Sequence, residues 1–222
     1  MNVTLALGTA VDLTQTVFEG MTIYPGDPPP KISRVKTLEK DSVNLSSILM
    51  GSHTGTHVDA PIHFVRGGAG ADGLSSEQFV GEAVVLDFSS LPPGSGITAD
   101  DLEKHGGEVK EGVIVLLYTG LSRHWGEAWA TTKFTYLTGG AAAWLVSRKV
   151  KAVGIDYLSV EEYGAKDPVA HVTLLKNGIP IIESLNSNLA SLVGRRTLLV
   201  CLFMKLRDID GAPARAIAFP LE

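Results

Sequence analysis

The sequence predicts one α/β domain with mixed sheets, and three observations support this fold class. Near-continuous apolar runs, typical of strands covered on both faces, occur from Glu82 to Phe88 and from Val113 to Tyr118. Segments with helical patterns alternate with some strand-like segments, while other strand-like segments follow one another directly. The 222 residues contain no linker, repeat or low-complexity tract, so we expect a single domain spanning residues 1–222.

Three strands and one stiff loop are expected in the first fifty residues. Val11 to Thr16 begins the first strand. The segment from Tyr24 to Pro30 must be a shaped loop, because prolines fix φ and its glycine permits a sharp turn. Tyr24 is therefore a candidate platform for a substrate, the alternative being a simply packed side chain. Lys31 to Thr37 alternates weakly as a strand, and Val43 to Met50 is a stronger strand that leads into a histidine-rich stretch.

Later segments follow similar patterns. Arg66 to Gly73 is rich in glycine but lacks the strand and helix context of a phosphate-binding loop, so it is expected to be mobile surface. Trp125 to Phe134 is aromatic and irregular, which suggests a pocket wall or a subunit contact. Further helices are expected at Thr98 to Glu103 and Thr138 to Val150, and further strands at Ala152 to Tyr157, Ile179 to Ile182, Arg195 to Leu206 and Gly211 to Phe219.

Composition and charge limit the kinds of partner. Hydrophobic residues make up 45% of the chain, and the formal charge of −5 is not accompanied by a Lys/Arg cluster. These features argue against nucleic acid and membrane surfaces and favour a small-molecule substrate. Cys201, the only cysteine, lies in an apolar run and is expected to fill the core. Met1 to Ala10 lacks the features of a signal peptide, so a cytoplasmic location is expected.

The stretch from Ser52 to Phe64 holds three of the six histidines and one carboxylate. His53, His57, Asp59 and His63 occupy odd positions, so an extended chain would place all four on one face. β-branched residues, an interior glycine and a proline disfavour a helix. A loop or strand end is predicted, and four such residues within eleven positions favour a functional site over a structural role.

The chemistry of a metal site fits this stretch. Imidazole nitrogens and carboxylate oxygens hold a transition metal at about 2.0–2.2 Å. An extended run from His53 to His57 would span roughly 13 Å, so the chain must curl, and Gly55 is where it could do so. His53, His57 and Asp59 are then candidate ligands. His63 is assigned as the general base, because an unperturbed imidazole pKa of about 6.5 suits proton transfer.

A predicted helix from Asp167 to Gly178 carries a fourth candidate site histidine, His171. Asp167 is expected at the N-cap and Pro168 at the first helical position. His171 lies one turn into this helix and shares a face with two leucines, so it is expected to point inward.

A carboxylate follows at the end of the next apolar strand. Glu183 would be costly to bury there unless it meets a cation. His171 and Glu183 are therefore natural candidates for the second half of a metal site. The alternative is a buried, hydrogen-bonded histidine together with a glutamate paired to Arg195 or Arg196.

The residues from His53 to Phe64 match the signature H-x-G-T-H-x-D-x-P-x-H-F. The chain thus resembles the cyclase-family metal hydrolases, which include bacterial kynurenine formamidases and isatin hydrolases. Further landmarks resemble the family in order along most of the chain: Tyr24 to Pro28, Gly154 to Asp156, His171 with Glu183, and Asp210 to Arg215. The resemblance implies a swivelling β/β/α-type domain that assembles as a homodimer or homotetramer, with its site near a subunit boundary.

The resemblance also implies roles for individual residues. The positions that match His53, His57 and Asp59 bind one zinc ion in formamidase-like members. Asp59 would bridge to a second zinc ion held by the positions that match His171 and Glu183. The position matching His63 donates and accepts the proton, and the position matching Tyr24 contacts the substrate. Formamidases usually have tryptophan there, so Tyr24 is a departure. Isatin-hydrolase-like members use one manganese ion.

Together these features predict a metal-dependent hydrolase of small-molecule amides. The bond would be an N-formyl aryl amide or a cyclic amide, cleaved by metal-activated water with His63 as proton shuttle. A lactonase or a true cyclase on the same metal site is an alternative. An alternative of another class is a non-enzymatic metal-binding or sensor protein, against which His63, not needed for coordination, argues.

Overall fold

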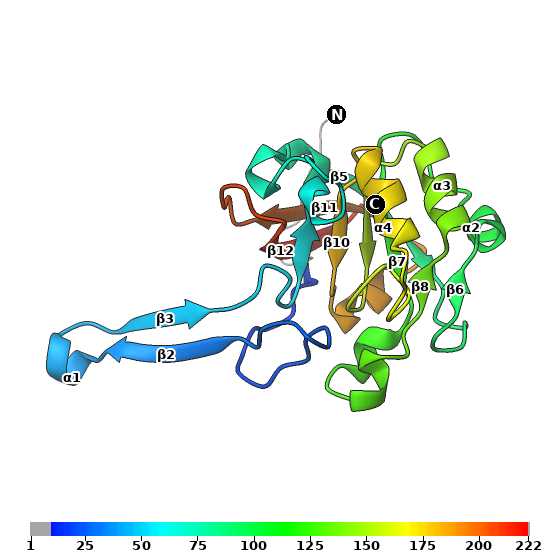
Figure 1. Cartoon of the computed structure of the whole chain (residues 1–222). Helices are drawn as coiled ribbons and strands as arrows, with labels where there is room; N and C mark the ends of the chain where they lie inside the picture. Colours follow the sequence, from blue (N-terminus) through cyan, green and yellow to red (C-terminus); the bar gives the residue numbers. More distant parts are fainter. Residues whose placement is uncertain (1–9, 222) are drawn as a thin grey trace.

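A mixed β-sheet that closes on itself forms the centre of the molecule (Figure 1). The computed structural model describes residues 10–221, so the predicted absence of a signal peptide concerns a segment almost wholly outside the described residues. Seven strands close the barrel in the order β12, β11, β5, β7, β9, β10 and β4, and β4 pairs back to β12 while β1 adds to β12. The strands of this sheet are β1 Val11–Asp12, β4 His57–Asp59, β5 Val80–Asp87, β7 Ile114–Tyr118, β9 Ala152–Ile155, β10 Ile181–Glu183, β11 Arg196–Phe203 and β12 Gly211–Pro220.

Four neighbouring strands, β5, β7, β9 and β10, are parallel, and they carry the apolar runs seen in the sequence. Alternate side chains of these strands enter two separate cores. Val85 and Leu116 lie in the core inside the barrel, whereas Leu86 and Leu117 lie in the core between the barrel and the helices. Strands covered on both faces need apolar residues at every position, which explains the near-continuous runs.

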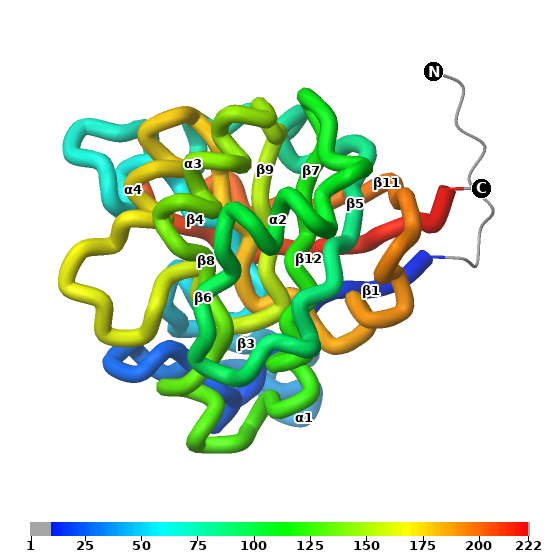
Figure 2. Tube along the Cα trace, turned by 90° about the vertical axis from the view of Figure 1, so that its right-hand side faces the viewer, coloured from blue at the N-terminus to red at the C-terminus, as the bar shows by residue number. Residues whose placement is uncertain are grey.

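Three helices pack on one side of the barrel (Figure 2): α2 Ala99–His105, α3 Gly139–Ser147 and α4 Val169–Lys176. A capping box begins α2, because the Thr98 side chain accepts from the backbone N–H of Asp101 and the Asp101 side chain accepts from the backbone N–H of Thr98. The small elements are α1 Leu38–Asp41, the paired strands β2 Lys31–Lys36 and β3 Leu45–Leu49, and the paired strands β6 Gly96–Ile97 and β8 Tyr136–Leu137. No helix within residues 10–221 has the length and apolar character needed to cross a membrane.

The predicted α/β fold with mixed strands is confirmed, and Cys201 is buried in the core as expected. The closed barrel was not predicted. Its closure depends on the pairing of β12 with β4, in which Gly211 lies opposite Asp59. These segments are about 150 residues apart in the chain, and no local pattern in either segment indicates the pairing.

Several local predictions were wrong. Pro168, not Asp167, is the N-cap residue of α4. Its side chain makes no capping hydrogen bond to the helix. The segment Arg66 to Gly73 is not surface throughout, because Ala71 is buried in the barrel core. Trp125 to Phe134 does not line the cavity described below, so the pocket-wall alternative is wrong there, whereas the subunit contact stays a prediction. Phe134 packs instead against Tyr157 in a small separate core.

The strand before the histidine stretch also differs from the prediction. β3 pairs only with β2, and the two strands project away from the barrel (Figure 1). The metal-site candidates therefore do not follow a strand of the rigid scaffold. They lie on and around β4, a short buried strand in the barrel wall between β10 and β12.

Candidate metal centre

Strand β4 places two candidate ligands on the outer side of the barrel. Val58 enters the core inside the barrel, so His57 and Asp59 point the other way, toward α4. On β10, Ile182 likewise points inward and Glu183 outward. Glu183 lies directly opposite His57 in the antiparallel pairing of the two strands. The register of β4 with β10 therefore brings an imidazole and two carboxylates together.

The curl that the sequence predicted between His53 and His57 is present. Gly55 has φ of +65°, a conformation that residues with a Cβ rarely adopt, and the turn brings the His53 ring within 4.8 Å of the His57 ring. Gly211 on β12 makes room for His53. A Cβ at position 211 would lie 2.6 Å from Cε1 of His53, so any larger residue would displace this imidazole.

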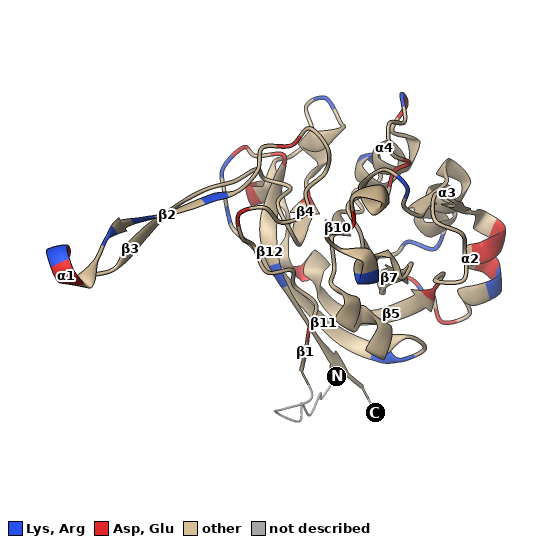
Figure 3. Ribbon diagram, turned by 90° about the horizontal axis from the view of Figure 1, so that it is seen from below, with Lys and Arg blue, Asp and Glu red and all other residues tan. Residues whose placement is uncertain are grey.

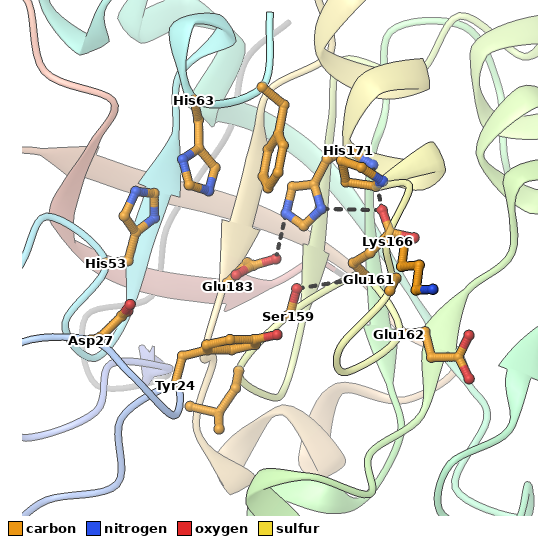
Figure 4. Close-up of a pocket in the computed structure, with 14 residues that line it drawn as sticks. Tyr24, Asp27, His53, His63, Ser159, Glu161, Glu162, Lys166, His171 and Glu183 are labelled. Carbon is orange, nitrogen blue, oxygen red and sulfur yellow. Dashed lines mark hydrogen bonds and ion pairs between the residues drawn. The ribbon is translucent and has the colours of Figure 1, made fainter.

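Helix α4 contributes His171, one turn from its start (Figure 4). Its Nε2 lies 3.4 Å from Oδ2 of Asp59 and 3.3 Å from Oε1 of Glu183. The helix begins where it does because the Glu161 carboxylate accepts from the backbone N–H groups of Ala170 and His171. Glu161 thus supplies the cap that Asp167 was expected to supply.

Asp59 is the centre of the cluster, with three imidazoles around it. Its Oδ1 lies 2.9 Å from Nδ1 of His53 and 3.3 Å from Nε2 of His57, while Oδ2 faces His171. Glu183 is bound by His57 and His171. Among the described residues every ion-pair partner of Asp59 and Glu183 is a histidine, and Arg196 pairs with Glu82 instead. The alternative in which Glu183 pairs with Arg196 is therefore wrong.

Each of the three imidazoles around Asp59 has an acceptor on its far side. His57 Nδ1 lies 2.8 Å from the carbonyl oxygen of Gly55, and His53 Nε2 lies 2.9 Å from Oδ2 of Asp210. His171 Nδ1 lies 3.4 Å from Oε2 of Glu161. Such an outer partner fixes the ring and leaves the other nitrogen directed inward, which is the usual arrangement around metal-binding histidines.

His63 differs from these three residues. It lies in a short 3-10 turn, Pro61–His63, that begins at the proline of the histidine-rich stretch. Its ring stacks on that of His53 with centroids 4.1 Å apart. Its nearest carboxylate oxygen, Oδ2 of Asp210, is 3.8 Å from Nδ1, beyond hydrogen-bond distance. Within residues 10–221, therefore, no side-chain hydrogen bond restrains this imidazole.

The electrostatics of the cluster favour proton sharing between imidazoles and carboxylates. Burial alone would lower the imidazole pKa values, but the close ion-pair contacts with Asp59 and Glu183 raise the pKa of His57 to about 10. Similar contacts hold the pKa of His171 well above its ordinary value. Burial would raise the pKa of Asp59, yet the three imidazoles hold it well below its ordinary value. Burial lowers the pKa of His63, which is therefore neutral at pH 7.

The residues present fit a divalent cation. Three buried polar atoms, Nε2 of His57 and both carboxylate oxygens of Asp59, are in ion-pair contact but have no partner in hydrogen-bond geometry within the described part of the chain. Leaving such atoms unsatisfied is costly, and a cation bound among them would compensate for it. Donor atoms of three residue groups lie within 4.8 Å of one another: His53 with His57 and Asp59, His53 with His63 and Asp210, and Asp59 with His63 and His171.

A cavity of about 330 Å³ opens beside the cluster (Figure 4). Four of the predicted site residues, His53, His63, His171 and Glu183, line it, and so does Tyr24. The Tyr24 ring lies across the cavity opposite the histidines and contacts the Tyr163 ring, with centroids 5.7 Å apart. The structure therefore brings together every site residue that the sequence predicted.

Three residues near the cluster were not predicted as site residues. Asp27 lines the cavity from the same proline-rich loop as Tyr24. The prediction that this loop contributes to a substrate site could therefore have included Asp27. Asp210 approaches His53 only because β12 pairs with β4. Glu161 lies in a polar segment with no recognisable pattern, and no signal in the sequence marks it. Asp156, which resembles a family landmark, is buried away from the cavity and accepts hydrogen bonds from Thr119, Gly120 and Ser122.

The fold and the site define a class: a mixed β-barrel enzyme scaffold with a histidine and carboxylate centre on its outer wall. Residues 11–162 match the model of the Cyclase family, described as "Putative cyclase". The chain belongs to this family. The kynurenine formamidase of Bacillus cereus is 32% identical over 213 residues, which cover 95% of this chain and 97% of that protein.

Solved structures support the same assignment. A structure described as a potential metal-dependent hydrolase with cyclase activity matches with a TM-score of 0.82 at 32% identity, covering 96% of this chain and 98% of the other. Isatin hydrolase A from Ralstonia solanacearum matches with a TM-score of 0.83 at 26% identity, covering 95% and 91% of the two chains.

Proposed function

We propose that this protein is a metal-dependent hydrolase that cleaves a non-peptide amide bond of a small molecule. One observation carries the proposal: three imidazoles, each with an outer acceptor, surround Asp59 beside a cavity, and a fourth, unrestrained imidazole lies next to them. The relatives named kynurenine formamidase and isatin hydrolase support an amide or a cyclic amide as the substrate class.

The cluster divides into two groups of ligands. His53, His57 and Asp59 would hold one divalent ion, and Asp59, His171 and Glu183 would hold a second ion where two are present. We propose zinc as the metal, with manganese as the alternative. A bound ion of this kind supplies Lewis acidity, which polarises a carbonyl group and makes water more acidic.

His63 is proposed to move the proton. Burial lowers its pKa, so the ring is neutral at pH 7 and one ring nitrogen can accept the proton of the attacking water. The same nitrogen then delivers this proton to the departing nitrogen of the amide. The stacking of His63 on His53 keeps the ring beside the centre, while the 3.8 Å gap to Asp210 leaves it free to turn.

The cavity is suited to a compact, partly aromatic substrate. Its volume of about 330 Å³ lies at the small end of the range for ligand pockets, which is about 300–1,000 Å³. Tyr24 and Phe64 line it with aromatic rings, and Asp27 and Lys166 add charged groups. We propose that Tyr24 contacts the substrate. An N-formyl aryl amide or a lactam such as isatin has the size and the carbonyl group that this cavity requires.

A panel of three substrates tests the proposal. The purified chain, stripped with a chelator and reloaded with zinc or manganese, is incubated with an N-formyl aryl amine, an isatin-like lactam and a lactone. Hydrolysis of the formyl amide or the lactam, lost on chelation and restored on reloading, is the expected result. Hydrolysis of the lactone alone would support a lactonase instead, and no turnover with any of the three would contradict the proposal.

Metal loading at pH 7 is expected to release protons. With raised pKa values, His57 and His171 hold protons in the metal-free protein, yet metal binding requires neutral imidazoles. Affinity should therefore rise with pH between about 7 and about 10. Calorimetric titration in buffers of different ionisation enthalpy should show at least one proton released per chain. An observed enthalpy that does not depend on the buffer would contradict this prediction.

Other features remain proposals that rest on the family resemblance. They are the swivelling β/β/α classification, assembly as a homodimer or homotetramer, and a cytoplasmic location. The absence of nucleic-acid and membrane partners rests on the charge balance of the chain.

A further inference from the structure

A short segment, Ser159 to Glu161, contacts both candidate ligands that belong only to the second ion. Oε2 of the Glu161 carboxylate lies 3.4 Å from Nδ1 of His171. The backbone N–H of Val160 donates to Oε1 of Glu183 over 2.7 Å. His171 and Glu183 come from separate elements, α4 and β10, which lie side by side (Figure 3). Three consecutive residues therefore bridge the helix and the strand that carry these ligands.

The segment is held firmly by the rest of the chain. Val160 is buried in the core between the barrel and the helices, and its carbonyl oxygen accepts from the backbone N–H of Leu137. The hydroxyl group of Ser159 accepts from the backbone N–H of Glu161. The chain that follows, from residue 162 to residue 167, is exposed. Glu161, whose side chain is 14% exposed, is thus the last anchored residue before an exposed loop.

One oxygen atom of Glu161 makes three contacts. Oε2 accepts from the backbone N–H groups of Ala170 and His171, at 2.9 and 3.2 Å, and also lies near Nδ1 of His171. Pro168, the N-cap residue of α4, provides no capping hydrogen bond, so within residues 10–221 Glu161 is the side chain that accepts from the first N–H groups of this helix. A carboxylate at a helix N-terminus is also favourable electrostatically. The same atom therefore fixes where α4 begins and how the His171 ring is turned.

The segment contacts one half of the metal centre and not the other. Among the described residues, no hydrogen bond or ion pair joins it to His53, His57 or Asp59. A change in the segment can therefore reach the centre only through His171 and Glu183. We expect such a change to affect the second ion and to leave the first ion in place.

We propose that Glu161 is a positioning residue that determines whether the second ion position is occupied. It acts by holding Nδ1 of His171, which leaves Nε2 of this ring directed at Asp59 and Glu183. Outer carboxylates of this kind orient a histidine ligand and raise its basicity, and their loss typically lowers metal affinity by about 10–100-fold. The inference rests on the proposed function, because it takes the cluster to be a metal centre.

Calorimetric titration of the metal-free chain with zinc, in competition with a chelator, tests the proposal. The wild-type chain should bind two ions. Glu161→Ala should lower the affinity for one ion by about 10–100-fold and leave the affinity for the other unchanged. Glu162→Ala is the matched control, because it removes an equal charge from the same cavity wall. Within residues 10–221 no hydrogen bond or ion pair joins Glu162 to His171 or Glu183, so both affinities should stay unchanged in this control.

Glu161→Gln separates positioning from helix capping. The amide oxygen of glutamine can still accept from the backbone N–H groups of α4, so the metal-free variant should unfold at nearly the same temperature as the wild type. The negative charge beside His171 is lost, so the affinity for one ion should still fall by about 10-fold or more. If Glu161→Gln keeps both the unfolding temperature and the two affinities of the wild type, Glu161 is a cap only and the proposal is wrong.

Replacing His171 shows whether Glu161 acts through this ligand. His171→Ala should lose one ion, and adding Glu161→Gln to it should not change the affinity for the ion that remains. A further loss of affinity in the double variant would mean that Glu161 acts through its charge at long range. A wild-type chain that binds one ion would leave Glu161 no second ion to position. Either result would overturn the proposal.

None of these measurements depends on substrate turnover, so the inference and the proposed function can fail separately. Two bound ions with the expected changes in the variants, but no hydrolysis of any of the three substrates, would contradict the proposed function alone. Hydrolysis by a chain that binds one ion would contradict the role of Glu161 alone.

Discussion

Replacing His63 by alanine is expected to lower kcat/KM by about 10²–10⁴-fold, which is the usual contribution of a general acid and base. The metal content should not change, because the imidazoles and carboxylates that surround Asp59 remain in place. Steady-state kinetics and elemental analysis of the same preparation measure the two quantities. A loss of turnover with full metal content would identify His63 as the residue that moves the proton.

His124→Ala is the matched control for this variant. His124 is an exposed histidine outside the cavity, paired with Glu127, so its loss should change neither activity nor metal content. If His63→Ala loses metal, His63 is a ligand and the proposed division of roles is wrong. The donor atoms permit that outcome, because His63 also lies within 4.8 Å of Asp59 and His171.

The local part of the candidate site was predictable because its residues follow one another in the chain. The spacing of His53, His57 and Asp59, together with Gly55, already required a curl, and the positive φ at Gly55 confirms it. His171 was predictable because helical periodicity places it on the same face as Leu174 and Leu175, and all three are buried. Glu183 was predictable because an apolar strand ends in an acidic residue.

The outer partners of the histidines were harder to predict for a physical reason. Asp210 and Glu161 reach the site through tertiary packing, in one case strand pairing across about 150 residues and in the other a loop that folds back onto α4. Neither arrangement leaves a periodic signal in the local sequence. The same reason applies to the barrel, whose strands were mostly predicted while its closure was not.

The hairpin of β2 and β3 shows the reverse case. Alternation of residues correctly predicted β2 and β3 as strands, because each residue's φ/ψ preference is local. Whether a strand joins the central sheet depends on which surfaces it can bury, and every residue of β2 and β3 is exposed.

Replacing Asp59 by asparagine is expected to abolish metal binding. As a result, the activity should fall by more than about 100-fold. Removing merely an outer partner of a ligand typically costs about 10–100-fold, and Asp59 is the carboxylate that faces all three imidazoles of the cluster. Asparagine keeps the shape but removes the negative charge that the cation and the imidazolium groups both need. Elemental analysis, with Asp87→Asn at an exposed strand end as control, measures the loss.

Comparison with Glu183→Gln separates a one-ion centre from a two-ion centre. If Asp59 bridges two ions, Asp59→Asn should lose both, whereas Glu183→Gln should lose one and keep the ion held by His53, His57 and Asp59. In a centre with one ion at His53, His57 and Asp59, Glu183→Gln should leave the metal content unchanged. Full metal content in Asp59→Asn would contradict the ligand role of Asp59 in either case, because the three imidazoles would then hold the ion without the carboxylate between them.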